Sequence, residues 1–171
     1  MQRVISSLAR AVFVALVATL GDYVWTSDWQ VPLGSRVEVI GEAYRGRSVG
    51  LSESSGGRSD RLYAFNGPLT DPRTLVRGVR SSGGWLQLSV QALRPLGFNF
   101  AYGQEDQNNR DIRFGTVAAN TRLKNQVGSA NFIYQLRANL LFSLEHRRIW
   151  THYPAGRYVN GHYNLTVGYL F

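Results

Sequence analysis

Apolar and polar residues alternate along most of the chain after residue 21. The alternation is clearest near the C-terminus, where Leu165, Val167 and Tyr169 are separated by single polar or small residues. A period of two is typical of a β-strand with one face in an apolar environment and the other in a polar one. None of these segments has apolar residues at the i, i+3, i+4, i+7 spacing of a helix face. The pattern therefore predicts an all-β fold. Seven segments show the alternation: 22–31, 36–46, 84–93, 97–105, 126–136, 139–151 and 159–171.

Short and long connections join these segments in turn. Residues 31–34 and 94–97 both contain Pro-Leu-Gly, which suits a tight turn because proline presets φ and glycine closes it. The connections over 48–82 and 105–124 are much longer. Short turns at one end and long loops at the other, joined by strands of about 9–11 residues, are typical of an antiparallel, up-and-down transmembrane β-barrel.

The two faces of the predicted strands differ in a way that favours a membrane barrel over a soluble one. One face carries successive large apolar residues with aromatic rings near the strand ends, as at Trp29, Trp150, Tyr169 and Phe171, which matches the aromatic girdles of a membrane barrel. The other face is polar, and we expect it to line the lumen. The alternative is that this face is the solvated outer surface of a soluble barrel. The expected lining residues are Arg36, Glu38, Glu42, Gln87, Gln91, Asn99, Glu145 and Arg147.

The N-terminal segment allows two interpretations. Residues 1–21 contain Arg3 and Arg10, then a ten-residue apolar stretch over 11–20 and a small residue, Gly21. These are the proportions of a secretory signal peptide. The alternative is a buried strand over residues 9–20, because valine, phenylalanine and threonine suit a strand.

The last ten residues, 162–171, resemble the C-terminal strand of Gram-negative outer-membrane β-barrels. In that class, alternate apolar residues ending in phenylalanine form the signal read by the barrel-assembly machinery. Segments 28–34, 41–47 and 139–146 are in addition similar to the C-terminal part of large porin-like barrels. The residues that occupy the positions of the assembly signal are Leu165, Val167, Tyr169 and Phe171.

This resemblance implies a location in the outer membrane and a channel for passive diffusion of small polar solutes. It also implies contact with the lipid bilayer and with lipopolysaccharide, and a homotrimer as the common assembly of the class. No enzymatic activity and no cofactor are expected from it.

The number of predicted strands raises a question of closure. A single-chain bacterial barrel has an even number of strands, whereas the alternation predicts seven. We therefore expect the truncated C-terminal portion of a larger porin-like barrel. The alternative is a self-contained eight-stranded barrel, with a structural or lipopolysaccharide-interacting role, in which the N-terminal segment supplies the missing strand.

The charge of the chain is basic, and arginine supplies nearly all of it. The 171 residues carry a formal charge of +8, and Lys124 is the only lysine. A basic patch in the long loop is expected to attract anionic solutes or to bind lipopolysaccharide phosphates through bidentate arginine contacts. Neither a basic helix nor a stacking platform is evident, so nucleic acid is not an expected partner. The residues of this patch are Arg58, Arg61, Arg73, Arg77 and Arg80.

The sequence gives little indication of a catalytic site or a metal site. Ser143, Glu145 and His146 lie close in sequence, but on a strand the serine and the glutamate share one face and the histidine takes the other. A lipid-modifying enzyme therefore stays a less favoured alternative. The chain has no cysteine and only 3 histidines, and no carboxylates are clustered beside the histidines to complete a set of metal ligands. No metal site is therefore expected.

Overall fold

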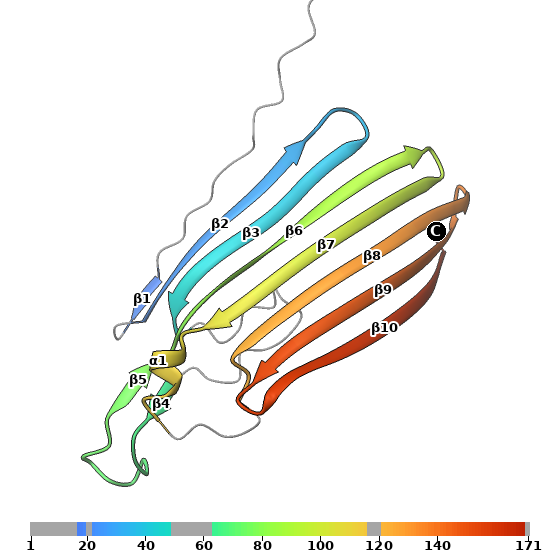
Figure 1. Cartoon of the computed structure of the whole chain (residues 1–171). Coiled ribbons are helices and arrows are strands. Elements are labelled where there is room, and N and C mark those ends of the chain that lie inside the picture. The colour runs from blue at the N-terminus through green and yellow to red at the C-terminus, as the bar shows by residue number, and fades with distance from the viewer. Residues whose placement is uncertain (1–16, 20–21, 49–62, 116–120, 170–171) are drawn as a thin grey trace, which may run out of the picture.

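A computed structural model of the chain describes residues 17–19, 22–48, 63–115 and 121–169. Eight strands form one antiparallel sheet in the order β1-β2-β3-β6-β7-β8-β9-β10, and β4 and β5 form a separate hairpin (Figure 1). The predicted all-β, antiparallel, up-and-down arrangement is confirmed. The elements are β1 Val17–Thr19, β2 Asp22–Pro32, β3 Val37–Arg47, β4 Tyr63–Phe65, β5 Val76–Gly78, β6 Arg80–Leu93, β7 Leu96–Gln107, α1 Asn109–Ile112, β8 Lys124–Arg137, β9 Leu140–Tyr153 and β10 Gly156–Tyr169.

The sheet is open and does not close into a barrel within the described residues. Within the described residues, β10 has no neighbouring strand along its outer edge. At the opposite edge, the three residues of β1 pair only with the first residues of β2, Asp22 to Val24. The direction of the strands explains the gap. Both β2 and β10 run from the loop end of the sheet to its turn end, so they cannot pair with each other in the antiparallel manner of the other strands (Figure 1).

We call the end of the sheet with the β2–β3, β6–β7 and β8–β9 turns the turn end, and the other, with the longer connections, the loop end (Figure 1). The loop end also has one short connection, residues 154–155 between β9 and β10. The two Pro-Leu-Gly segments are used differently, contrary to expectation. Gly34 has φ +100°, a conformation that suits glycine, in the turn between β2 and β3. In the second segment the turn consists of Arg94 and Pro95, and Leu96 already begins β7.

The pairing register separates side chains into an apolar face and a polar face. Residues directly opposite each other on neighbouring strands point to the same face, and successive residues along a strand point to opposite faces. One row of paired residues across six strands is wholly apolar: Val37, Val90, Phe98, Phe132, Leu144 and Leu165. The next row toward the loop end is wholly polar: Glu38, Ser89, Asn99, Asn131, Glu145 and Asn164.

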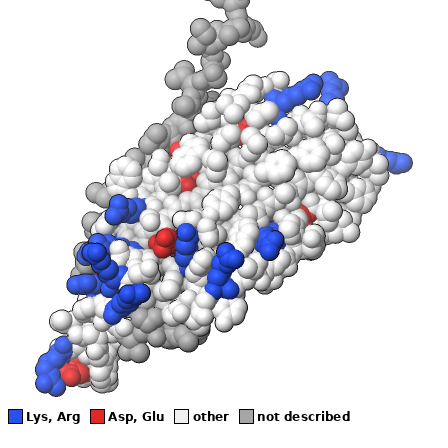
Figure 2. All heavy atoms as spheres, in the orientation of Figure 1, with Lys and Arg blue, Asp and Glu red and all other residues white. Residues whose placement is uncertain are grey.

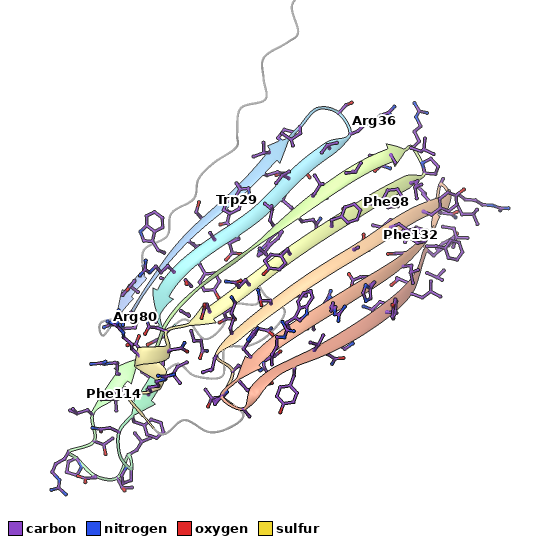
Figure 3. All side chains as sticks on the ribbon, in the orientation of Figure 1. Trp29, Arg36, Arg80, Phe98, Phe114 and Phe132 are labelled. Atoms are coloured by element: carbon purple, nitrogen blue, oxygen red, sulfur yellow. The ribbon has the colours of Figure 1, made fainter. Side chains whose placement is uncertain are left out.

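The apolar face is exposed rather than packed against other parts of the chain. Tyr163 and Leu165 on β10 are each 75% exposed, and Trp25 on β2 is 54% exposed. Phe98 and Phe132 lie beside each other on β7 and β8 (Figure 3). The described chain therefore has no hydrophobic core beneath its main sheet, and this face needs another apolar environment.

The strands are staggered by about one residue per strand. Val37, the first residue of β3, lies in the same row as Leu144, which comes four residues after the start of β9 at Leu140. Four strand-to-strand steps separate β3 from β9 in the sheet. Stagger and tilt are linked in barrels, and a stagger of about one residue per strand corresponds to a tilt of about 36°.

Candidate functional site

The polar face collects most of the residues expected to line a lumen. The register places seven of the eight on this face: Glu38, Glu42, Gln87, Gln91, Asn99, Glu145 and Arg147. The eighth, Arg36, belongs to the turn between β2 and β3, because β3 begins only at Val37. Its carbonyl oxygen accepts a hydrogen bond of 2.7 Å from the Gln91 N–H.

Hydrogen bonds connect neighbouring strands across the polar face around Glu145. The Oε1 atom of Glu145 accepts from Asn164 Nδ2 at 3.1 Å and lies 3.0 Å from a guanidinium nitrogen of Arg147. Asn99 Nδ2 donates to Asn131 Oδ1 at 2.8 Å. Such cross-strand pairs hold polar groups in defined positions on a sheet surface.

Carboxylates outnumber cations on the polar face. Glu38 Oε1 accepts from Gln30 Nε2 at 2.6 Å, and Glu42 Oε2 accepts from the Trp85 indole at 3.3 Å. In the described long strands, Arg147 is the only arginine or lysine on this face. The face is therefore net negative, although the whole chain is basic. Its carboxylates are Asp28, Glu38, Glu42, Glu105 and Glu145.

A hollow of about 480 Å³ lies at the turn end of the sheet. Arg36 and Arg94 contribute to its wall from two turns, and Glu38, Gln91 and Asn99 contribute from β3, β6 and β7. Both signs of charge and several amides thus border one space, together with the apolar side chains of Pro32, Pro95 and Ile133. The hollow therefore has a mixed lining.

Ser143, Glu145 and His146 are divided between the faces, as the alternation predicted. Ser143 and Glu145 lie on the polar face, whereas His146 stacks on Tyr163 of the apolar face with ring centroids 4.6 Å apart. Over the described part of the chain, no group of three or more His, Asp or Glu residues is placed to hold a metal ion. The described residues also contain no helix long and apolar enough to span a membrane.

The residues of the assembly signal lie on the last strand. Leu165, Val167 and Tyr169 share the apolar face of β10. The Tyr169 hydroxyl accepts a hydrogen bond of 2.8 Å from Asn139 Nδ2. Phe171 lies outside the described residues.

A small folded unit, which we call the loop-end cap, lies beyond the end of the sheet and consists of β4, β5 and α1 (Figure 1). Ala64, Val79 and Ile112 form its fully buried apolar centre, with Phe114 and Leu123 packed against them. The helix is short, and its N-terminus is satisfied by the Asn108 side chain. The cap therefore has its own core, separate from the exposed face of the sheet.

Asp111 joins the loop-end cap to the main sheet. Its carboxylate accepts from Arg80 at three points: the backbone N–H at 3.1 Å, Nε at 2.7 Å and a terminal guanidinium nitrogen at 3.1 Å. The Asp111 side chain is only 2% exposed. Sequence reasoning missed this pair because the two residues are far apart in the chain and belong to no periodic pattern. The Asn-rich segment 107–109 signals only the local helix start.

Of the predicted basic patch, the structure describes Arg73, Arg77 and Arg80, and these three are engaged in separate contacts. Arg80 is bound to Asp111, and it lies near Phe114 and α1 (Figure 3). Arg77 is 3.8 Å from Asp111 and lies over the Phe114 ring at 4.7 Å. Arg73 pairs with Asp71 at 3.2 Å in an exposed turn. Arg58 and Arg61 lie outside the described residues.

The environment of Asp111 holds the pKa of its carboxyl below the ordinary value. Burial is the largest single influence and raises the pKa, but the hydrogen bonds from Arg80 and the charges of Arg80 and Arg77 together outweigh it. The ionised carboxylate is thus the form that the folded cap stabilises.

Replacement of Asp111 is expected to open the loop-end cap. Asp111→Asn leaves the Arg80 guanidinium without its counter-charge, but the Arg80 side chain is 38% exposed, so solvent screens part of the loss. We expect a roughly tenfold larger open population, measurable as faster hydrogen exchange over 76–80 and 109–114. Asp71→Asn, at the exposed pair with Arg73, serves as the control and should leave the exchange unchanged. Equal effects of the two variants would contradict the structural role of Asp111.

The same pair predicts how the cap responds to pH. A carboxyl whose pKa is lowered by folding contributes stability that is complete above its unfolded pKa of about 3.9 and is lost as pH falls through the folded value. Protection of the cap should therefore stay constant from pH 7 to about pH 5 and decline below about pH 4. Hydrogen exchange over 108–115, compared at each pH with the intrinsic exchange rate, measures this from pH 7 to pH 3. A decline already between pH 7 and pH 5 would assign the stability to another group.

Comparison of the chain with protein-family models, with curated proteins and with solved structures finds no match in any of the three.

Proposed function

We propose that this chain forms part of the wall of an outer-membrane β-barrel that acts as a channel for passive diffusion of small polar solutes. The observation that carries the proposal is the pair of neighbouring rows described above, one wholly apolar and one wholly polar across six strands. Large apolar side chains are exposed on the apolar face. A barrel wall between lipid and an aqueous lumen requires this arrangement.

The dimensions of the apolar face support the same proposal. On β10 this face is uncharged from Val159 to Tyr169, which spans about 33 Å at about 3.3 Å per residue. On the neighbouring β9, Arg148 lies opposite Gly161, within this span. At the tilt of about 36° that the stagger implies, the span on β10 is about 27 Å along the membrane normal. The value is close to the apolar band of about 25 Å in outer-membrane barrels. The rings of Trp29 and Trp150, both on the apolar face, suit the interfacial regions.

Closure of the barrel takes additional strands beside β2 and β10. An unpaired edge in lipid leaves backbone N–H and C=O groups unsatisfied at a cost of several kcal/mol each. In the proposed channel these strands belong to a larger porin-like barrel, of which the described sheet is the C-terminal portion.

A second candidate is a self-contained eight-stranded barrel with a structural role, and β1 favours it. This strand pairs with β2 in antiparallel fashion, so its direction also suits antiparallel pairing with β10. A barrel of this size has its interior filled by side chains and conducts little. Conductance therefore distinguishes the two candidates.

The charge on the polar face changes the expected solute preference. The arginine-rich loop suggested anions, but Arg80 is engaged by Asp111 and the polar face carries an excess of carboxylates. A ring of carboxylates in a pore favours cations. We therefore propose a channel with a preference for small cations, in place of the expected preference for anions.

Planar-bilayer recordings of the intact channel, purified from outer membranes with all of its strands, test this proposal. We expect discrete conductance steps with a reversal potential that favours K⁺ over Cl⁻ in a salt gradient. Glu38→Gln combined with Glu42→Gln should lower that preference without abolishing conductance, because it removes two carboxylates from the polar face. The control, Asp71→Gln, changes an exposed carboxylate in the loop-end cap and should have no effect.

Two outcomes would overturn the channel proposal or its selectivity. Protein that is demonstrably inserted, yet shows no conductance steps at any voltage, would exclude the channel and favour the eight-stranded structural barrel. A preference for Cl⁻, or the same shift in the control as in the double variant, would exclude the role assigned to Glu38 and Glu42.

A further inference from the structure

Two arginines at the turn end of the sheet are not paired with a carboxylate. Figure 2 shows a larger group of Lys and Arg side chains at the loop end and a smaller group at the turn end. At the turn end, Arg36 lies in the turn between β2 and β3 (Figure 3) and Arg94 in the turn between β6 and β7. Both are exposed, and neither forms an ion pair within the described part of the chain. Their charges are therefore available to an anionic group of a ligand.

Gln91, near the end of β6, holds the backbones of both arginines in place. Its N–H donates to the Arg36 carbonyl at 2.7 Å, beside the start of β3. Its side-chain Nε2 donates to the Leu93 carbonyl at 2.7 Å and to the Arg94 carbonyl at 3.3 Å. One glutamine thus joins the two turns, so that the two arginines lie near each other although they are far apart in the chain.

A second glutamine, Gln135 on β8, joins the next turn to this group. Its N–H donates to the Pro95 carbonyl at 2.7 Å, and its side-chain Nε2 donates to the Ala138 carbonyl at 3.1 Å. Because the amide nitrogens of Gln91 and Gln135 bond to turn carbonyls, their amide oxygens are left as acceptors. The turns are therefore fixed before any ligand binds, which lowers the entropic cost of binding.

The hollow of about 480 Å³ lies between these turns and has both arginines and both glutamines in its wall. This volume is within the range of sites for small molecules. Gly97 borders the hollow without a side chain, and a Cβ there would lie 3.4 Å from the Gln91 Oε1 atom. The apolar part of the wall consists of Pro32, Pro95 and Ile133, among others.

Glu38 gives the same hollow a negative group. Its Oε1 atom accepts from Gln30 Nε2 at 2.6 Å, and no ion pair with an arginine or lysine of the described strands neutralises it. A simple anion would meet the two guanidinium groups but would also be repelled by this carboxylate. A ligand with a carboxylate at one end and an ammonium group at the other satisfies both signs of charge. A short peptide has these two ends, amide groups for the glutamines, and side chains for the apolar part of the wall.

We propose that the hollow at the turn end binds short peptides with free ends. The peptide carboxylate accepts from Arg36 and Arg94, because guanidinium groups form charge-assisted, bidentate contacts with carboxylates. The ammonium group lies toward Glu38, and peptide N–H groups donate to Gln91 and Gln135. This site goes beyond the proposed channel, since its wall consists of described strands and turns that are already joined to one another.

Titration calorimetry of the intact protein, purified in detergent with all of its strands, tests the site with trialanine as the probe. We expect saturable binding. Trialanine amide lacks the carboxylate and should bind roughly tenfold more weakly, because contacts with two exposed guanidinium groups are lost. Acetyl-trialanine lacks the ammonium group and should bind roughly threefold more weakly. Sodium acetate at the concentration of the peptide should not compete.

Variants assign these effects to individual side chains. Arg36→Gln combined with Arg94→Gln should weaken the binding of trialanine roughly tenfold but leave that of trialanine amide unchanged, since the amide has no carboxylate for these arginines. Glu38→Gln should remove the difference between trialanine and acetyl-trialanine. The matched control, Arg113→Gln combined with Arg137→Gln, removes the same charge from exposed positions outside the wall and should bind as the wild type does.

Four outcomes would overturn the inference. The first is no binding of trialanine, and the second is equal affinity for trialanine and its amide; neither needs a variant that folds. Equal weakening in the double variant and the control would reduce Arg36 and Arg94 to general surface charge. Full competition by acetate would identify a free anion as the ligand. None of these measurements depends on conductance, so failure of the peptide site and failure of the channel are distinguishable.

Discussion

The antiparallel register is the constraint on which the other features of this protein depend. Because side chains alternate between faces, a shift of one residue between two strands would exchange the apolar and polar sets. Asn99 pairs with Asn131, and Phe98 with Phe132, so a shift of one residue would place either Phe98 opposite Asn131 or Asn99 opposite Phe132, depending on its direction. The backbone ladder thus determines which residues meet the lumen and which meet the apolar surroundings.

The loop end of the sheet combines two kinds of arginine that the overall charge does not distinguish. Arg80 is part of the structure, since Asp111 binds its side chain and its backbone N–H and so joins the loop-end cap to β6. Arg45 and Arg157 extend from the apolar face and have no carboxylate partner among the described residues. The basic character of the chain therefore divides into a structural part and a part available for anions. The polar face is net negative and carries few of the chain's cations.

Sequence reasoning succeeded where the signal was local and periodic, and failed where it was not. Alternation identified the long strands and assigned Glu145 and Arg147 to the polar face because period two is read directly from neighbouring residues. It did not reveal that Arg80 binds Asp111, which approaches from a different loop. It also placed Arg36 on a strand, although the chain turns through residues 33–36 before β3 begins.

The sequence by itself determined the all-β fold, the succession of antiparallel strands, and the division of each strand into an apolar and a polar side, because each of these follows from interactions within a few residues. Only the tertiary structure decided how the strands are staggered, that β2 and β10 run in the same direction and leave the sheet open, and that cations from β3, β8 and β10 lie together at one end of the apolar face. These properties depend on pairings between residues far apart in the chain. No local pattern encodes them, since the same alternation is compatible with several registers until hydrogen bonds and turns select one.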